Sequence, residues 1–244
     1  MKIKNSVALL LVATSPFCAA LAKRPATENG SFEHQAAGLA WQCVPQPKLP
    51  NVLLLGDSIS IGYTLQVREL LKGKANVYRP LRRNGKPDNC FTVANGITNL
   101  TNWIGTQTWS VIHFNFGLHD LKYLDGSGKL DRVHGKQVTL INEYQENLEK
   151  LLPLLQKTGA KLIFATTTTV PTNELGRIAG DEVTFNAAAV AVMMKHGVAI
   201  DDLHALTATF PPELFKLPAN VHYSDTGYAR LAHQVAESIL KMLP

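Results

Sequence analysis

The sequence has little cysteine and none of the short motifs that mark metal or nucleotide sites. Three cysteines occur in 244 residues, with no Cys-x-x-Cys pair, no His-Glu-x-x-His and no His/Cys cluster at zinc spacing. No Gly-x-Gly-x-x-Gly follows the first apolar run, and no Walker pattern is present, which argues against a flavin or nucleotide protein. We therefore expect chemistry that uses protein side chains alone, with no metal and no organic cofactor.

A strong charge imbalance is also lacking. The formal net charge of +5 is too mild to indicate a nucleic-acid partner, and it falls further if the basic leader described next is removed. One loop, residues 79–86, does carry Arg79, Arg82, Arg83 and Lys86. It is either a solvated basic loop or a rim that attracts an anionic substrate.

The first 22 residues have the pattern of a secretory signal peptide. Two lysines precede an apolar run from Val7 to Val12, and Ala20-Leu21-Ala22 matches a small-residue cleavage site. An uncleaved anchor is the alternative, but Pro16 interrupts the run, and a span needs about 20 apolar residues. No later segment is long enough, so we expect no stable membrane insertion. We expect export to the periplasm or the medium, with the mature chain starting at Lys23.

Two cysteines remain after the leader. Cys43 and Cys90 could form a disulfide in an oxidising compartment, or they could stay as separate thiols. The prolines at 45, 47 and 50 predict that residues 23–50 form an irregular arm. The domain proper would then cover residues 51–244.

Short apolar runs alternate with helical patterns through this domain. Continuous apolar runs of this length are typical of parallel strands that are covered on both faces. The runs predict strands at 52–55, 76–78, 111–116, 161–165 and 198–200, and apolar spacing predicts helices over 138–155, 181–195 and 228–242. Pro153 should kink or shorten the first of these helices. The alternation predicts one α/β domain with a parallel five-stranded sheet.

The residues that follow the strands are the ones to examine for chemistry, because ligands bind at the carboxyl ends of such sheets. Gly56-Asp57-Ser58 follows the first strand and opens a helix, where backbone amides can stabilise an oxyanion. Taken alone, Asp57 or Ser58 could simply cap that helix. His222 lies just before the last helix and could serve as a base for Ser58.

Taken together, these segments resemble the SGNH hydrolases, the GDSL-type esterases and lipases, over about residues 51–243. The matching segments are Gly56-Asp57-Ser58, Gly96, Gly117-Leu118-His119-Asp120 and the late His222. The resemblance implies a flavodoxin-like three-layer α/β/α sandwich. It also implies that Ser58 is the nucleophile, that His222 is the general base, and that Ser58 and Gly96 give backbone N–H groups to the oxyanion hole.

Two positions depart from the family pattern. His119 stands where the family has an asparagine that donates to the oxyanion; an imidazole N–H can also donate, although a purely structural His119 is the alternative. Ala219 stands where the family has the acid that orients the histidine. A Ser–His dyad, a backbone carbonyl, or an acid from elsewhere such as Asp201 or Asp202 could replace it, whereas Asp225 is expected to cap the last helix.

The expected function is that of an exported serine ester hydrolase which removes acetyl groups from a carbohydrate. A lipase or thioesterase is one alternative. A non-catalytic glycan-binding protein on the same fold is another, because the positions of His119 and Ala219 are what a decayed site would show. Trp103, Trp109 and Tyr123 are candidate aromatics for a sugar, although Trp103 fits the apolar face of a helix. The sequence leaves the oligomeric state open.

Overall fold

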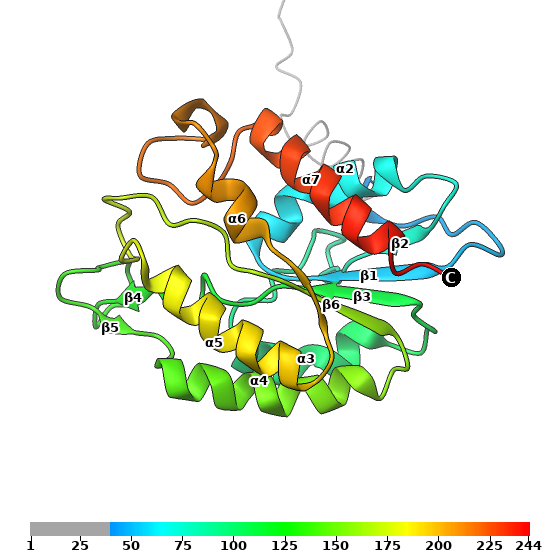
Figure 1. Ribbon diagram of the computed structural model, residues 1–244, viewed down its shortest axis with the longest axis horizontal. Coiled ribbons are helices and arrows are strands. Elements are labelled where there is room, and N and C mark those ends of the chain that lie inside the picture. The colour runs from blue at the N-terminus through cyan, green and yellow to red at the C-terminus, as the bar shows by residue number, and fades with distance from the viewer. Residues whose placement is uncertain (1–39) are drawn as a thin grey trace, which may run out of the picture.

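Five parallel strands form the central sheet of the protein, whose computed structural model describes residues 40–244 (Figure 1). The strands are β1 (Asn51–Leu55), β2 (Asn76–Tyr78), β3 (Val111–Phe114), β6 (Lys161–Ala165) and β7 (Ala199–Asp201), in the order β2-β1-β3-β6-β7. Leu55 of β1 pairs with Phe114 of β3, so these two strands end at the same edge. This confirms the predicted parallel five-stranded sheet.

Helices cover both faces of the sheet and complete three layers (Figure 1). Two helices, α2 (Ser58–Leu70) and α7 (Asp225–Leu240), pack against each other on one face. On the other face α4 (Ile141–Gln156) packs between α3 (Val93–Ile104) and α5 (Asp181–Lys195). The short α6 (Leu203–Ala208) follows β7 and contacts α7. The predicted α/β/α class is confirmed.

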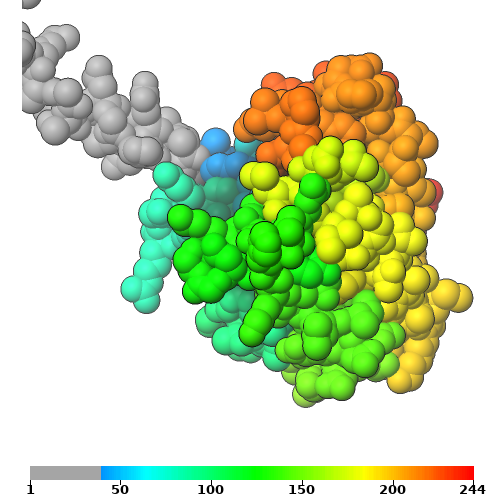
Figure 2. All heavy atoms as spheres, turned by 90° about the vertical axis from the view of Figure 1, so that its left-hand side faces the viewer, coloured from blue at the N-terminus to red at the C-terminus, as the bar shows by residue number. Residues whose placement is uncertain are grey.

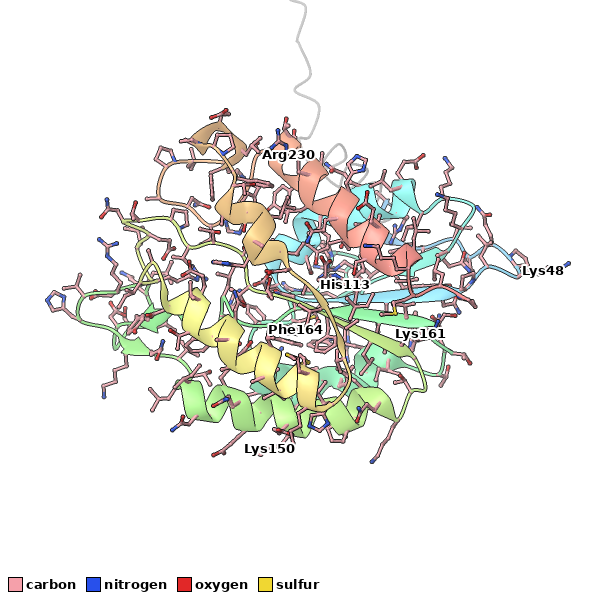
Figure 3. The ribbon with its side chains drawn as sticks, in the orientation of Figure 1. Lys48, His113, Lys150, Lys161, Phe164 and Arg230 are labelled. Atoms are coloured by element: carbon pink, nitrogen blue, oxygen red, sulfur yellow. The ribbon has the colours of Figure 1, made fainter. Side chains whose placement is uncertain are left out.

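The core lies between these layers because the sheet is apolar on both sides. Residues 52–55 of β1 are each at most 1% exposed. Figure 3 shows His113 and Phe164 in the interior, with Lys150 and Arg230 on the outer sides of their helices. His113 is fully buried and pairs with Asp201 at 2.9 Å, with the ring of Tyr63 edge-on to it. One buried polar pair thus links β3 to β7.

The predicted elements match the structure closely, with one addition. Pro153 lies inside α4, which continues to Gln156 while Leu151, Leu152 and Leu155 are buried. The hairpin of β4 (Tyr123–Leu124) and β5 (Lys136–Gln137), which are two-residue strands, was not predicted from the sequence. This hairpin lies against the loop between β6 and α5, since Tyr123 N–H donates to Gly176 O at 2.7 Å.

The start of the described chain runs beside α2 before it enters β1. Arg68 holds it there by donating to the carbonyl oxygens of Ala40, Trp41 and Gln42. Cys43 and Cys90 are free thiols. The expected signal peptide and most of the arm, through residue 39, lie outside the described residues. No helix of the described part is long and apolar enough to cross a membrane.

Candidate active site

Ser58 lies at the carboxyl edge of the sheet, directly after β1. Gly56 and Asp57 turn the chain, and Asp57 Oδ1 accepts the Ile59 N–H at 2.9 Å, so Asp57 caps α2. Ser58 is the first residue of α2 and is half-buried. Its N–H has no acceptor within residues 40–244, as is usual for the first amide of a helix. Serine and amide are thus presented together at the positive end of the helix.

His222 comes to Ser58 from the other end of the chain. Its Nε2 lies 2.9 Å from Ser58 Oγ across 164 positions of sequence. The segment that carries His222 is fixed on one side by Lys216 N–H, which donates to His222 O at 2.9 Å. The structure therefore brings together the two residues that the sequence predicts as nucleophile and base, at the distance of a hydrogen bond.

Asn220 fixes the protonation pattern of the His222 ring. Asn220 Oδ1 lies 2.9 Å from the backbone N of His222 and 2.8 Å from its ring Nδ1. A backbone N–H can only donate, so the atom facing it is the amide oxygen, and the same oxygen requires a proton on Nδ1. Neutral His222 then has its lone pair on Nε2, where it can accept the Ser58 hydroxyl proton. Asn220 occupies the orienting role that the sequence left unassigned.

None of the acids considered from the sequence contacts His222. Asp201 pairs with His113 and Gln234, while Asp202 caps α6 and accepts from Thr166. The expectation that Asp225 caps α7 is wrong, because the Ser224 side chain accepts from Gly227 N–H. Ala219 adopts a left-handed backbone (φ 54°), which places its successor Asn220 beside the ring.

His119 follows β3, and the side chain of Lys122 is hydrogen-bonded to its ring. Lys122 Nζ lies 3.2 Å from His119 Nδ1, and the ring of Phe91 stands edge-on at a centroid distance of 5.0 Å. The next residue, Asp120, is buried and accepts the Val93 N–H, which ties this loop to the start of α3. Sequence reasoning identified His119 but missed Lys122, Phe91 and Asn220, because none of them belongs to a motif.

Gly96 does not take the predicted oxyanion role. It lies inside α3 rather than before it, and its N–H donates to Thr92 O at 3.0 Å within the first helical turn. A Cβ at this position would meet Phe116 Cζ at 2.8 Å. Gly96 is therefore a packing residue that lets α3 approach Phe116, and the prediction for it is wrong.

Fixed charges surround the Ser58–His222 pair. Burial lowers the pKa of His222, with Asp57 opposing this and the positive charges of Arg177 and Lys216 adding to it. Arg177 is buried, donates to Leu118 O at 2.8 Å and pairs with Glu174 at 3.1 Å. Burial raises the pKa of Asp57, whose Oδ2 has no partner in the described part of the chain. Near neutral pH His222 is thus kept uncharged and able to act as a base.

Comparison with known proteins gives a likeness of structure only. No protein-family model matches the sequence, and no curated protein matches it. A lipase/acylhydrolase from Enterococcus faecalis shares 17% identity with a TM-score of 0.64, covering 80% of this chain and 98% of that one. The acetylxylan esterase Axe2 from Geobacillus stearothermophilus shares 18% identity with a TM-score of 0.61, covering 78% and 94%.

A protein from Slackia heliotrinireducens that is assigned to the SGNH hydrolases shares 15% identity with a TM-score of 0.56, covering 79% of this chain and all of that one. The chain has the SGNH hydrolase fold. In this SGNH fold, Ser58 and His222 lie within hydrogen-bond distance of each other at the carboxyl edge of the sheet.

The carboxyl edge of the SGNH fold is the face that Figure 2 turns to the viewer, where the β4–β5 hairpin (green) lies against the β6–α5 loop (yellow). A cavity of about 380 Å³ adjoins His222 and is lined by Lys216, Tyr223, Ser224, Asp225 and Tyr228. Among residues 40–244 no group of three or more His, Cys, Asp or Glu could hold a metal ion.

Two arginines of the basic loop and two of the candidate aromatics border a cavity that Ser58 does not reach. Arg82, Arg83, Trp103 and Trp109 line a different cavity of about 630 Å³, whose lining includes neither Ser58 nor His222. Trp109 is only 5% exposed, which makes it a core residue. Arg79 is buried as well, so it is no part of a solvated rim.

Proposed function

We propose that this protein is a serine carboxyl-ester hydrolase that acts by acyl transfer through Ser58 and His222. The observation that carries the proposal is the relay from Asn220 Oδ1 to His222 Nδ1 and from His222 Nε2 to Ser58 Oγ, at 2.8 and 2.9 Å. Such a relay serves a nucleophile that must lose its proton as it attacks. The esterases and acylhydrolases with the same fold support this reaction class.

In the first half of the reaction Ser58 Oγ forms a bond to the carbonyl carbon of the ester. His222 Nε2 takes the hydroxyl proton, and the carbonyl oxygen becomes an oxyanion. The Ser58 N–H, at the start of α2, and His119 are the proposed donors to that oxyanion. The ester C–O bond then breaks, the alcohol leaves with the proton from His222, and the acyl group stays on Ser58.

In the second half water replaces the alcohol. His222 takes a proton from water as the oxygen attacks the acyl carbon, the bond to Ser58 Oγ breaks, and His222 returns the proton to the serine. The acid is released and the starting state is restored. Asn220 keeps Nδ1 protonated throughout, so one ring nitrogen handles every proton transfer.

The proposed substrate is an acetyl group on a carbohydrate. The cavity that adjoins His222 does not have Ser58 in its lining, but Lys216, Ser224 and Asp225 border it, and these polar side chains suit the hydroxyl groups of a sugar that carries the ester. The similar Geobacillus protein is named an acetylxylan esterase. A long acyl chain is the second candidate, because the hairpin and the β6–α5 loop expose Leu130, Val133 and Leu175. Rates on nitrophenyl esters from acetate to palmitate separate the two: a fall with chain length supports the acetyl ester.

The test of the reaction uses Ser58→Ala with Ser127→Ala, an exposed serine of the hairpin, as the control. Wild type and Ser127→Ala should cleave nitrophenyl acetate and react with a fluorophosphonate probe, whereas Ser58→Ala should do neither. A folded wild-type protein that neither cleaves esters nor takes up the probe would favour the non-catalytic glycan-binding alternative.

Export is a separate proposal that rests on the leader pattern of residues 1–22. Expression of the full chain in a Gram-negative host should yield protein in the periplasm or medium whose first residue is Lys23. Full-length protein retained inside the cell would refute it.

A further inference from the structure

Lys122 is a half-buried lysine whose ammonium contacts an imidazole and no carboxylate. Its Nζ lies 3.2 Å from His119 Nδ1, and it takes part in no ion pair within residues 40–244. Half-buried lysines ordinarily pair with an acid, since taking the charge partly out of water costs free energy. The pairing with a histidine at the same edge of the sheet as Ser58 therefore needs a reason.

The ammonium decides which ring nitrogen of His119 carries the proton. An ammonium only donates, so Nδ1 must present a lone pair, and the neutral ring carries its proton on Nε2. Nε2 has no partner within the described chain and is not among its buried unpartnered atoms. The ring thus has one nitrogen held by Lys122 and one N–H that is open to a bound molecule.

The charges that face His119 keep it from gaining a second proton. The pKa of His119 is lowered to about 3. The largest cause is burial of the ring, and the positive charges of Lys122, of Arg177 from the β6–α5 loop and of His222 add to it. The remaining neighbour, Phe91, is uncharged. His119 is therefore a neutral N–H donor at every pH at which His222 is a base.

We propose that Lys122 is a positioning residue which turns neutral His119 into a polarised hydrogen-bond donor for the oxyanion of the proposed ester hydrolysis. This inference rests on the proposed function. A charge-assisted hydrogen bond at Nδ1 draws electron density from the ring and strengthens the N–H on the opposite side. The lysine charge thus reaches the oxyanion through the imidazole, and no proton moves.

The fold holds Lys122 in the place that this role requires. It directly precedes β4, and its carbonyl accepts the Val138 N–H at 2.8 Å, just beyond β5. Gln137 Nε2 also donates to the neighbouring Leu121 O, at 3.4 Å. The small β4–β5 hairpin therefore fixes the backbone from which the lysine reaches back to His119.

The test is a double-mutant cycle of Lys122→Met and His119→Asn, assayed on nitrophenyl acetate. An asparagine amide carries its own N–H donors and needs no lysine to set a tautomer. We expect Lys122→Met to lower kcat about fivefold to tenfold with KM nearly unchanged, since the strengthening of one hydrogen bond is lost. In the His119→Asn background the same change should cost less than twofold. Lys129→Met, an exposed hairpin lysine, is the control and should match wild type.

An equal loss of kcat in both backgrounds would overturn the inference, because Lys122 would then act as a distant charge rather than through His119.

A second readout needs no activity. With ¹⁵N-labelled histidine, wild-type His119 should show an Nε2-protonated neutral ring across the accessible pH range, and Lys122→Met should raise its pKa. An unchanged titration and tautomer in Lys122→Met would also overturn the inference, and this readout decides the matter if His119→Asn is too slow to assay. Inactive wild-type protein refutes the proposed function instead, so the two failures are distinguishable.

Discussion

Asn220 Oδ1 accepts two hydrogen bonds from one residue, the backbone N–H of His222 at 2.9 Å and its ring Nδ1–H at 2.8 Å. The first bond fixes the amide, and the amide then orients the ring. A neutral amide provides geometry and tautomer but no negative charge for the imidazolium that forms during catalysis. The aspartate of a catalytic triad both orients the histidine ring and stabilises the imidazolium charge, whereas Asn220 does only the first.

Removing Asn220 should slow the proposed reaction. In Asn220→Ala the Nδ1–H loses its acceptor, and a hydrogen bond to a group that becomes charged contributes about 1.5–3 kcal/mol. That corresponds to a fall in kcat of roughly 10- to 150-fold on nitrophenyl acetate. Asn142→Ala, at the exposed start of α4, is the control and should match wild type. Unchanged kcat in Asn220→Ala would show that the ring is held by other contacts.

Restoring a carboxylate should move the pH profile. In Asn220→Asp the new negative charge next to Nδ1 raises the pKa of His222, so the acid limb of kcat/KM shifts to higher pH. We expect the plateau kcat to be at least that of wild type, because the imidazolium gains a counter-charge. A limb that stays in place would mean that the titrating group is not His222.

The pH dependence of the wild type follows from the charges around His222. Its pKa is lowered from 6.5, so the unprotonated base is already present at lower pH, and kcat/KM should rise with pH and reach half of its plateau below pH 6.5. Lys216→Met removes one of the lowering charges and should move this limb upward. Lys216 is exposed, so the shift should shrink as salt is added. Lys74→Met, in the exposed turn that follows α2, should leave the limb in place.

The layers of this fold could be predicted from the sequence because the strands are buried on both faces. Runs such as residues 52–55 and 162–165 are apolar without alternation, and each lies in a central strand. The β4–β5 hairpin could not be predicted, because a strand of two residues is too short to show an alternation of buried and exposed side chains in the sequence. Pro153 is tolerated inside α4 because burial of the neighbouring leucines holds that helix together.

At the site, motif residues could be predicted and supporting residues could not. Ser58 and His222 come from recognisable segments, and the structure places them at hydrogen-bond distance. Asn220 lies one residue beyond the position where an acid was sought, and its role depends on the left-handed Ala219. The oxyanion role was expected of Gly96 because the sequence does not show that α3 begins at Val93, which leaves the Gly96 N–H bonded within the helix. Such offsets of a few residues are set by tertiary packing.

Gly96 should respond to mutation as a packing residue. In Gly96→Ala the new Cβ meets Phe116, which is 1% exposed and closely surrounded. Overpacking costs about 1–3 kcal/mol, and the better helix propensity of alanine offsets up to about 1 kcal/mol. We expect a net loss of about 1 kcal/mol in the free energy of unfolding by urea denaturation. Gly126→Ala, where a Cβ meets nothing within 4 Å, should be neutral or slightly stabilising. A stabilised Gly96→Ala would show that Phe116 can move aside.

Arg79 should be the most sensitive of the basic-loop residues, because it holds the turn that presents Ser58. Its guanidinium is buried and donates to Gly56 O, Asp88 O, Ser60 Oγ and Thr64 Oγ1 at 2.8–3.2 Å. Arg79→Met removes the guanidinium donor from all four acceptors, and of these Gly56 O still accepts the Cys90 N–H. We expect a loss of about 3 kcal/mol in unfolding free energy.

The matched control for Arg79 is Arg83→Met in the same loop, where the side chain is exposed and the effect should be within about 0.5 kcal/mol. Where Arg79→Met remains folded at low temperature, kcat should fall more than KM rises, since Ser58 is less well placed for attack. Equal stability of the two variants would show that water replaces the guanidinium and that the Gly56 turn holds without it.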